Sequence, residues 1–391
     1  MTKRLLIVQF AGDFREAWRL RERTGGETYY GHGYILDELA RLAAKHGEAG
    51  FLCGTAPPYC EKLPTGATVL GAGADAYKDP RPIIAAIERF DPTHLIVHGP
   101  MVKLLRWSLG RDLPLGCLLA DSFLMNPLER WWRFAGLSRA LNDPGISLVA
   151  NHGVNAARNL VEIGVAADKV IAWDFPHLRT PDGVPARTAP PPRSCNVFYV
   201  GSIGRKKGVG DLIEAAARLR DRFDVKVRIA GAGKIELFRA QARRLGIADQ
   251  VEFLGLVPNS RVSELMREAD LVVVPSRLSF PEGLPLTLYE ALASRTPTVA
   301  SSHPMFTGHL VDGESAAIYP AGDAHALADR IAAVLSDPAL YQGLSHGARE
   351  AWHRMQIPVK WGTMIDHWVS GDEADRTWLA SHTLSGGGQA S

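Results

Sequence analysis

The sequence is poor in cysteine, and its four cysteines have no metal-binding spacing. Cys53, Cys60, Cys117 and Cys195 are scattered along the chain without any Cys-x-x-Cys pair. All but Cys60 lie in or beside apolar, strand-like runs, where buried free thiols are expected. This usage argues against a disulfide framework and against a zinc site.

No excess charge and no long apolar run is present either. The chain has 44 basic and 42 acidic residues, for a formal net charge of +2. Such a balance lacks the electrostatic footprint of a nucleic-acid-binding protein. Residues 1–5 lead directly into an apolar strand without a signal-peptide core, and no segment is long enough to span a bilayer. We therefore expect a cytoplasmic location.

Several motifs of common enzyme classes are missing. There is no His-Glu-x-x-His and no zinc spacing, and the one Gly-x-Ser-x-Gly, Gly343 to Gly347, lies in a helical segment rather than at a strand-to-helix turn, which argues against the common hydrolases. There is also no Asp-x-Asp, so no carboxylate pair that would chelate a metal against a diphosphate is evident. We expect neither a metal nor another cofactor, and Lys, Arg and helix dipoles would have to neutralise any bound phosphates.

What the sequence does contain is a repeated alternation of apolar strands and helical segments. At 391 residues it exceeds the usual size of a single core, so two domains are expected. The alternation predicts βαβ units and parallel sheets, hence an α/β fold of two doubly wound, Rossmann-like domains. Ligands of such sheets bind at the carboxyl ends of the strands, which places the expected site in a deep cleft between the domains.

A Pro-rich segment divides the pattern. It covers residues 179–192 and reads as an interdomain linker, because it cannot lie inside a helix or sheet. We expect an N-terminal domain over 1–178 and a C-terminal domain over 193–349, with helices from about 350 to 380 completing the first domain. The Gly-rich tail, 385–391, is expected to be disordered.

The most informative stretch is residues 280–292, with the sequence FPEGLPLTLYEAL. It follows a buried strand, and Pro285 suits the first turn of a helix that starts at Leu286. Glu282 then precedes the helix and Glu290 lies inside it, on either side of backbone N–H groups that suit a phosphate. This arrangement favours a nucleotide carrying a polyol. A surface glutamate beside a structural turn is the alternative for each carboxylate.

A basic turn opens the second domain, immediately after its first strand. The residues are Gly201-Ser202-Ile203-Gly204-Arg205-Lys206-Lys207-Gly208. Glycines allow the backbone to approach a ligand, and the basic side chains pair with phosphate. The turn reads as a pyrophosphate clamp or, taken alone, as a solvated basic turn. Two further turns, Gly231–Lys234 and the segment around Leu256, are structural turns or offer backbone groups near a nucleobase.

In the first domain, the segment after the first strand reads as a long loop over residues 11–28. Long loops in compact domains are often functional. Gly26 is a candidate for approach to the donor phosphates, and Asp13 and Arg15 are candidates for an acceptor pocket; a mobile surface loop is the alternative. Asp121 follows a strand directly, as either a site residue or an N-cap.

The segment Pro127–Phe134 mixes aromatic and basic residues. Trp131 and Trp132 suggest a peripheral membrane contact at the inner face of the membrane, or an acceptor platform. A packed core helix is the competing interpretation.

These motifs resemble the retaining GT-B glycosyltransferases usually called family 4, over most of the second domain from Asn196 to about Leu335. The most specific element is the Glu-x(7)-Glu spacing of Glu282 and Glu290. The resemblance implies that Glu282 contacts donor-sugar hydroxyls and that Glu290 holds the nucleotide ribose. It also places Lys207 on the pyrophosphate. Further donor-binding residues that it implies are Gly26, Ser202, Arg205, Lys206, Leu256, Gly283, Leu284 and Leu286.

The sequence departs from the family pattern at two places that matter. Ser202 stands where many members carry Arg, so Arg205 or Lys206 takes that role. Asp121 stands where the family frequently has a His against the donor sugar. Ser294-Arg295-Thr296-Pro297 also replaces a common Cys-Gly-Thr-Pro. These departures leave the catalytic role of Asp121 open.

The resemblance implies a glycosyltransferase that moves a sugar from a nucleotide-diphosphate sugar to a hydroxyl of a carbohydrate or glycolipid acceptor, with retention and without a metal. Cell-envelope polysaccharide or glycolipid synthesis is the implied setting. A GT-B sugar phosphorylase or epimerase, or a non-catalytic nucleotide-sugar-binding protein, are the alternatives. The donor base, donor sugar, acceptor and linkage leave no mark in the sequence.

Overall fold

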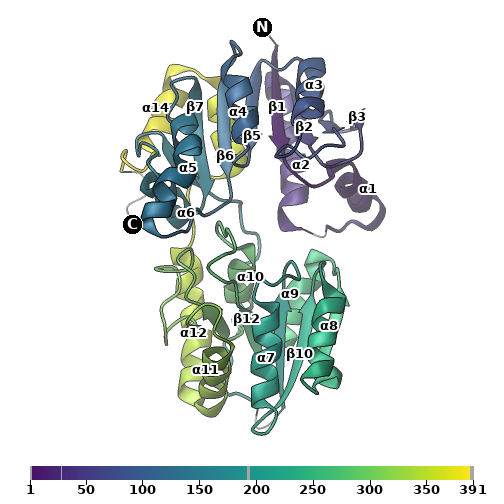
Figure 1. Ribbon diagram of the computed structural model, residues 1–391, viewed down its shortest axis with the longest axis vertical. Coiled ribbons are helices and arrows are strands. Elements are labelled where there is room, and N and C mark those ends of the chain that lie inside the picture. The colour runs from purple at the N-terminus through teal and green to yellow at the C-terminus, as the bar shows by residue number, and fades with distance from the viewer. Residues whose placement is uncertain (1, 28, 192–193, 388–391) are drawn as a thin grey trace. The chain divides into compact units, whose positions relative to one another are not determined.

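The computed structural model describes residues 2–27, 29–191 and 194–387, which fold into two compact units (Figure 1). Unit 1 comprises residues up to Pro176, the short segment Glu282–Leu284 and the chain from Ile357 onward. Unit 2 comprises His177–Pro281 and Pro285–Gln356. The Pro-rich segment therefore belongs to unit 2, and its described residues form neither helix nor strand.

Unit 1 is built on a sheet with the strand order β3-β4-β2-β1-β5-β6-β7-β8. All neighbouring strands run parallel except β3 and β4, which are antiparallel. The strands are β1 Lys3–Gln9, β2 Gly47–Cys53, β3 Tyr59–Lys62, β4 Thr68–Gly71, β5 His94–His98, β6 Leu115–Leu119, β7 Ile146–His152 and β8 Val170–Trp173.

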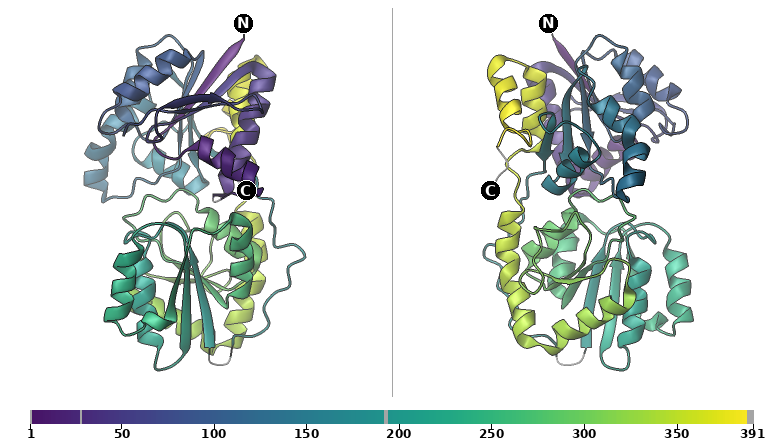
Figure 2. Two further views of the ribbon diagram at one scale, coloured as in Figure 1. Left: turned by 90° about the vertical axis from the view of Figure 1, so that its right-hand side faces the viewer. Right: turned by 60° about the vertical axis from the view of Figure 1, so that its left-hand side comes forward.

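Helices cover both faces of this sheet (Figure 2). Those on one face share an apolar cluster with Leu6, Val8 and Cys117; they are α3 Arg81–Phe90, α4 Val102–Leu109, α5 Pro127–Leu141 and α6 Val154–Glu162. The remaining helices are α1 Phe14–Thr24, α2 Tyr30–His46, α13 Trp361–Ser370 and α14 Glu373–Ser381. The last two, in yellow, come from the end of the chain.

Unit 2 repeats the design with a wholly parallel sheet, in the order β11-β10-β9-β12-β13-β14. Its strands are β9 Ser194–Val200, β10 Asp224–Ala230, β11 Val251–Gly255, β12 Leu271–Val274, β13 Thr298–Ser301 and β14 Ala317–Tyr319. The helices are α7 Val209–Leu219, α8 Ile235–Arg244, α9 Asn259–Glu268, α10 Leu286–Ser294, α11 Ala324–Ser336 and α12 Pro338–Arg354, with a 3-10 turn at Ala248–Gln250. Buried Val, Ile and Leu side chains fill the sheet faces, as parallel strands require. The predicted α/β class with two doubly wound sheets is confirmed.

The cysteine prediction is also confirmed, because Cys53, Cys117 and Cys195 are buried free thiols and only Cys60 is exposed. The prediction of a long loop over 11–28 is wrong. Helix α1 occupies its middle, since Asp13 caps the first turn and Gly25 closes the last turn with a left-handed φ of 68°. Phe14, Ala17 and Trp18 stand at the helical spacing i, i+3, i+4, so the sequence carries an apolar stripe, although only Phe14 of this helix is buried.

The tail predicted to be disordered from residue 385 begins in an ordered turn. Leu384 donates its N–H to Val170 O at 2.9 Å, and Gly386 donates to Thr383 O at 3.0 Å. The first bond holds Leu384 against β8 and the second closes a turn from Thr383 to Gly386, so residues 385–387 are ordered where the sequence predicts disorder. The rest of the predicted tail, 388–391, lies outside the described residues.

Candidate functional site

The turn that follows β9 in unit 2 is fastened to its neighbours through backbone groups. Gly201 donates its N–H to Ala230 O at 3.1 Å, and Ile203 donates to Ala232 O at 2.7 Å. A Cβ on Gly231 would lie 1.8 Å from Gly201 O, and one on Gly233 would lie 2.2 Å from Ile203 O. Gly231 and Gly233 therefore allow the turn after β10 to press against the basic turn, which makes Gly231–Lys234 a structural support.

The basic turn exposes the side chains that the sequence predicts to bind the donor. Ser202, Arg205 and Lys206 are exposed at the carboxyl end of β9. Lys207 is half-buried, and its Nζ lies 4.1 Å above the centre of the Phe280 ring. A cation over an aromatic face is held electrostatically in a fixed position. The loop that leads to Glu282 thus orients the lysine of the turn after β9.

Arg277 and Asp211 are site residues that sequence reasoning missed. The Arg277 guanidinium forms a two-pronged ion pair with the carboxylate of Asp211, whose side chain is 4% exposed. This hydrogen bonding raises the pKa of Arg277. The backbone N–H of Arg277 also donates to Lys206 O at 2.9 Å. Arg277 therefore ties the loop after β12 to both the basic turn and α7, through contacts that no local motif announces.

Helix α10 presents its first turn to the same edge of the sheet. No side chain caps its N-terminus, where Leu286 begins the helix, so its first N–H groups suit an anion. Glu290 accepts a hydrogen bond from Asn259 Nδ2 at 2.8 Å, which fixes the carboxylate that the sequence predicts to hold a ribose. Leu256, after β11, is 64% exposed. These residues and the basic turn all belong to unit 2.

His303 is a second residue that sequence reasoning did not single out. It is fully buried, and both of its ring nitrogens are used. Its Nε2 lies 3.1 Å from Phe280 O, and its Nδ1 accepts from the Met305 N–H at 3.2 Å. This tautomer leaves Nε2–H to donate, so His303 fixes the loop that carries the Phe280 ring.

Glu282, Gly283 and Leu284 form part of unit 1. Glu282 is 5% exposed. A Cβ on Gly283 would lie 2.8 Å from Ala120 O, and one on Gly153 would lie 2.9 Å from Leu284 Cβ. Gly283 therefore allows a close approach to the end of β6, directly beside Asp121.

Asp121 stands where β6 ends. Burial raises the pKa of its carboxyl to about 6, which suits a group that accepts a proton near neutral pH. On the neighbouring strand, His152 is buried and stacks on Trp173, and its Nε2 lies 3.0 Å from Asp174 Oδ1. This buried contact links the ends of β7 and β8 and so fixes the carboxyl edge of the sheet, where Asp121 also lies.

The acceptor-side candidates have structural contacts of their own. Asp13 accepts from the N–H groups of Arg15 and Glu16 and from the Tyr59 hydroxyl at 2.7 Å. The Arg15 guanidinium lies 3.8 Å from the centre of the Tyr59 ring. Gly26 follows the left-handed cap of α1, and its N–H donates to Thr24 Oγ1. Asp13 and Arg15 thus meet at Tyr59, while Gly26 lies between α1 and α2.

Helix α5 contains the aromatic and basic segment. Its C-terminal half packs into the core through Leu137 and Leu141, and Trp132 is 64% exposed. The side chain of Trp131 lies outside what the structure describes. None of the described helices is both long and apolar enough to cross a bilayer. Among the described residues, no three His, Cys, Asp or Glu side chains gather into a metal-binding group.

Residues 186–351 match the family model Glycosyl transferases group 1. This range covers most of unit 2, and it confirms the family resemblance seen in the motifs of that unit. A phosphatidyl-myo-inositol mannosyltransferase from Mycobacterium leprae is 35% identical over 165 residues, which are 42% of this chain and 43% of that protein. The chain spans about half the length of the curated relatives that it matches first.

Solved structures match along nearly the whole chain. Sucrose-phosphate synthase from Thermosynechococcus elongatus has a TM-score of 0.69 at 16% identity, over 97% of this chain and 98% of that one. Anabaena HepE, in complex with UDP-glucose, has a TM-score of 0.65 at 16% identity, over 94% of this chain and 98% of that one. At this level of identity the likeness establishes the fold, and it confirms the predicted GT-B class.

Proposed function

Because residues 186–351 are a glycosyl transferases group 1 domain, we propose that this protein is a glycosyltransferase. It moves a sugar from a nucleotide-diphosphate sugar to a hydroxyl of a carbohydrate or glycolipid, with retention of configuration and without a metal ion. The observation that carries the proposal is the meeting of the basic turn and α10 at one edge of the unit 2 sheet. Lys207 over Phe280 and Glu290 against Asn259 fix the two charged groups there.

The donor is assigned to these groups by chemistry. The N–H groups at the start of α10 and the cations of the basic turn suit a diphosphate, and the Glu290 carboxylate suits the hydroxyls of a ribose. The exposed Leu256 offers an apolar surface beside them for a nucleobase. In this proposal Gly26, Gly283, Leu284 and Leu286 contribute backbone contacts. Support from fold neighbours comes from HepE, which was solved with UDP-glucose.

The mechanism proposed is a front-face displacement. Lys207 and Arg205 stabilise the negative charge that develops on the leaving diphosphate, an electrostatic effect that needs no metal. Glu282 orients the donor sugar through its hydroxyls. The acceptor hydroxyl passes its proton to Asp121 or to the departing phosphate. The raised pKa of Asp121, about 6, supports the first route.

The acceptor is assigned to unit 1, in the region of Asp13 and Arg15. One relative acts on phosphatidyl-myo-inositol, which supports a lipid-linked acceptor and a role in cell-envelope synthesis. The exposed Trp132 supports a peripheral contact with the inner face of the membrane. Loss of vesicle binding in Trp132→Ser, with transfer to a soluble acceptor retained, is the expected result; equal vesicle binding would remove the membrane contact from the proposal.

The test starts with UDP, GDP and ADP sugars, screened by thermal shift and calorimetry. A true donor raises the melting temperature by mass action. With that donor, Lys207→Ala is expected to lower kcat by about 100-fold or more, whereas Glu290→Ala mainly raises KM. Lys226→Ala removes an exposed lysine of β10 and is the matched control.

Four outcomes would redirect the assignment. Wild-type rates in both Lys207→Ala and Glu290→Ala would sink the site. Cleavage of a glycoside that depends on free phosphate would indicate a phosphorylase, and donor binding without turnover would indicate a binding protein. A strict requirement for a divalent cation after chelator treatment would contradict the metal-independent mechanism.

A further inference from the structure

Unit 1 contains a cavity at the edge of the sheet opposite to Asp121. It lies where strands β1, β5 and β7 begin, at Lys3, His94 and Ile146, and α13 and α14 complete its walls. Its volume is about 750 Å³, within the range of about 300–1,000 Å³ that small-molecule sites occupy. The donor and acceptor sites proposed above use the carboxyl ends of the strands, so this cavity is a separate feature.

Cations outnumber carboxylates among the residues that line it. Lys3, Lys169 and Arg376 are the basic residues, and Asp168 is the acidic one. Lys169 donates from Nζ to Asp143 O at 2.7 Å, which leaves two ammonium protons for another acceptor. Burial lowers the pKa of Lys169, and the carboxylates of Asp143 and Asp168 oppose this only in part, so a further anion beside it would recover more of that cost. The charge of the lining therefore favours an anionic ligand.

His94 adds a neutral donor. Its Nδ1 lies 3.0 Å from Thr93 Oγ1. That hydroxyl accepts from the Arg4 N–H at 2.8 Å, and Nδ1 is a nearer acceptor for the hydroxyl proton than Arg4 O at 3.4 Å. When the hydroxyl donates to Nδ1, the neutral ring carries its proton on Nε2. Burial lowers the pKa of His94 to about 4, so the ring is neutral at physiological pH.

The other walls are apolar. Trp368 forms one side, and its indole N–H is already satisfied by Ser147 Oγ at 2.9 Å. Apolar side chains continue the surface on the strands and the C-terminal helices; they include Leu148, Ile171, Val369 and Leu379. A ligand that matches the whole cavity combines an apolar body with one anionic end.

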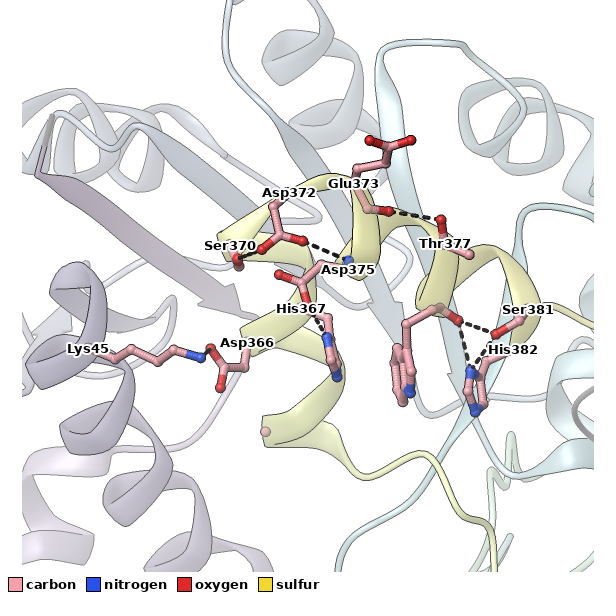
Figure 3. A network of polar contacts seen from close by, with 12 residues as sticks. Lys45, Asp366, His367, Ser370, Asp372, Glu373, Asp375, Thr377, Ser381 and His382 are labelled. Atoms are coloured by element: carbon pink, nitrogen blue, oxygen red, sulfur yellow. Dashed lines mark hydrogen bonds and ion pairs between the residues drawn. The ribbon is translucent and has the colours of Figure 1, made fainter.

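Helix α14 covers this cavity without burying any of its own residues. Polar and ring contacts hold it to α13 (Figure 3): His367 pairs with Asp375, and the Asp375 N–H donates to Asp372. The His367 ring stacks on Trp378 and the His382 ring lies tilted against it, each with centroids 4.1 Å apart. Arg376, Leu379 and Ala380 line the cavity. Helix α14 is therefore attached to α13 through one set of residues and lines the cavity with another set.

We propose that this cavity is a binding site for an amphiphilic anion, an apolar chain or ring that ends in a carboxylate or a phosphate. The anionic end meets Lys169, Arg376 and the Nε2–H of His94, and the apolar body lies against Trp368 beneath α14. The site is independent of the transferase assignment, because none of its residues belongs to the donor or acceptor groups.

Calorimetry on the full chain tests the proposal with decanoate and decyl phosphate, each below its micellar concentration. Decanol lacks the charge, and inorganic phosphate lacks the apolar body. One equivalent of a decyl anion is expected to bind at least tenfold more tightly than decanol or phosphate, and to change tryptophan fluorescence. Preference between decanoate and decyl phosphate tells which anionic end the site takes.

Arg376→Ala is expected to weaken binding of the preferred anion by about tenfold, because a hydrogen bond to a charged group is lost. Ala380→Trp fills the cavity from its cover and is expected to abolish binding. Glu373→Ala, on the solvent side of α14, and Arg239→Ala, in unit 2, are the matched controls. If Ala380→Trp fails to fold, Arg376→Glu repeats the test by reversing the charge. Equal affinity for decanol, or unchanged affinity in Arg376→Ala, would overturn the proposal.

Discussion

The two units share an architecture but build the carboxyl edges of their sheets in different ways. In unit 2, the turns after β9 and β10 are pressed together at glycines, with Gly231 against Gly201 O and Gly233 against Ile203 O. In unit 1, glycines such as Gly54 and Gly283 also allow close packing at the corresponding edge, and polar side chains line this edge as well, among them Asp121 and the buried pair of His152 and Asp174. At Gly231 and Gly233 the packing of the turns depends on the absence of a side chain. At Asp121 and His152 the contacts depend on the side chain itself.

This difference decides what a substitution can do. A side chain added to a closely packed glycine must displace backbone atoms, and it therefore lowers the free energy of unfolding. A side chain exchanged for one of the same shape at the unit 1 edge leaves the backbone in place, and its effect falls on protonation and chemistry. The predictions below are ordered by the expected change in the free energy of unfolding, and each control follows the variant to which it belongs.

Gly231→Ala is expected to have the largest effect. Its φ of 137° is one that side-chain-bearing residues rarely adopt, and the new Cβ would lie 1.8 Å from Gly201 O. We expect a loss of about 3 kcal/mol or more, with loss of nucleotide-sugar binding. Thermal unfolding and calorimetry measure both.

Gly255→Ala is the matched control for Gly231→Ala. Gly255 has a φ of 70°, and a Cβ there meets nothing within 4 Å. The only cost of the alanine side chain is the strain of the left-handed backbone conformation, so the free energy of unfolding is expected to fall by about 1 kcal/mol. Equal losses in the two variants would show that packing of the turns is not what Gly231 provides.

Asp121→Asn is expected to have an effect that depends on pH. Burial raises the folded-state pKa from 3.8 to about 6, so the folded protein binds this proton more tightly than the unfolded chain. The associated stability is present below about pH 4 and lost as pH rises through about 6. Above pH 6 the variant is therefore expected to exceed the wild type by up to about 3 kcal/mol, and below pH 4 the two converge.

The pH dependence of transfer sharpens this prediction. If Asp121 accepts the acceptor proton, wild-type turnover falls below a pH of about 6, and Asp121→Asn loses about 100-fold or more. Asp249→Asn removes an exposed carboxylate and serves as the control. A variant that gains stability but keeps full turnover would leave the departing phosphate as the proton acceptor.

Arg295 is an exception to the comparison, because a side chain rather than a glycine occupies a left-handed position in unit 2. Its φ is 54°, and its guanidinium donates to Val184 O at 3.0 Å and to Ser345 O at 3.2 Å. Arg295→Ala keeps the strain and loses both bonds, for an expected loss of about 1–2 kcal/mol. Arg295→Gly removes the strain as well and is expected to lie closer to the wild type. Chemical denaturation distinguishes them, and the opposite order would mean that strain is absent.

The sequence predicts the elements of unit 2 better than those of unit 1, because more of the elements in unit 2 have local signals in the sequence. The start of α10 is predicted at its observed position, Leu286, and the buried strand predicted before it is β12, Leu271–Val274, because an apolar run and a Pro-marked helix start are local signals. The short strands β3 and β4 are not predicted. Helices are predicted over about 350–380, a range that includes most of α14, but α14 buries none of its residues, and its own bounds are not predicted.

Candidate site residues divide in the same way. The Gly-rich basic turn and the Glu-x(7)-Glu spacing are visible because they lie within a few residues of each other. The pair of Arg277 and Asp211, separated by 66 positions, depends on two strands being adjacent in the sheet. His303 likewise reaches Phe280 O only after folding. Contacts between distant parts of the chain leave no local pattern in the sequence. They can therefore be identified only from the structure.

The glycine packing beneath the basic turn also bears on how such a protein changes specificity. Backbone hydrogen bonds fix the conformation of the turn, so the exposed side chains of Ser202, Arg205 and Leu256 are not needed for folding. Their replacement leaves the scaffold intact while the surface shown to a donor is altered. Under the proposed function, directed libraries at these three positions would therefore explore new donors without first having to regain stability.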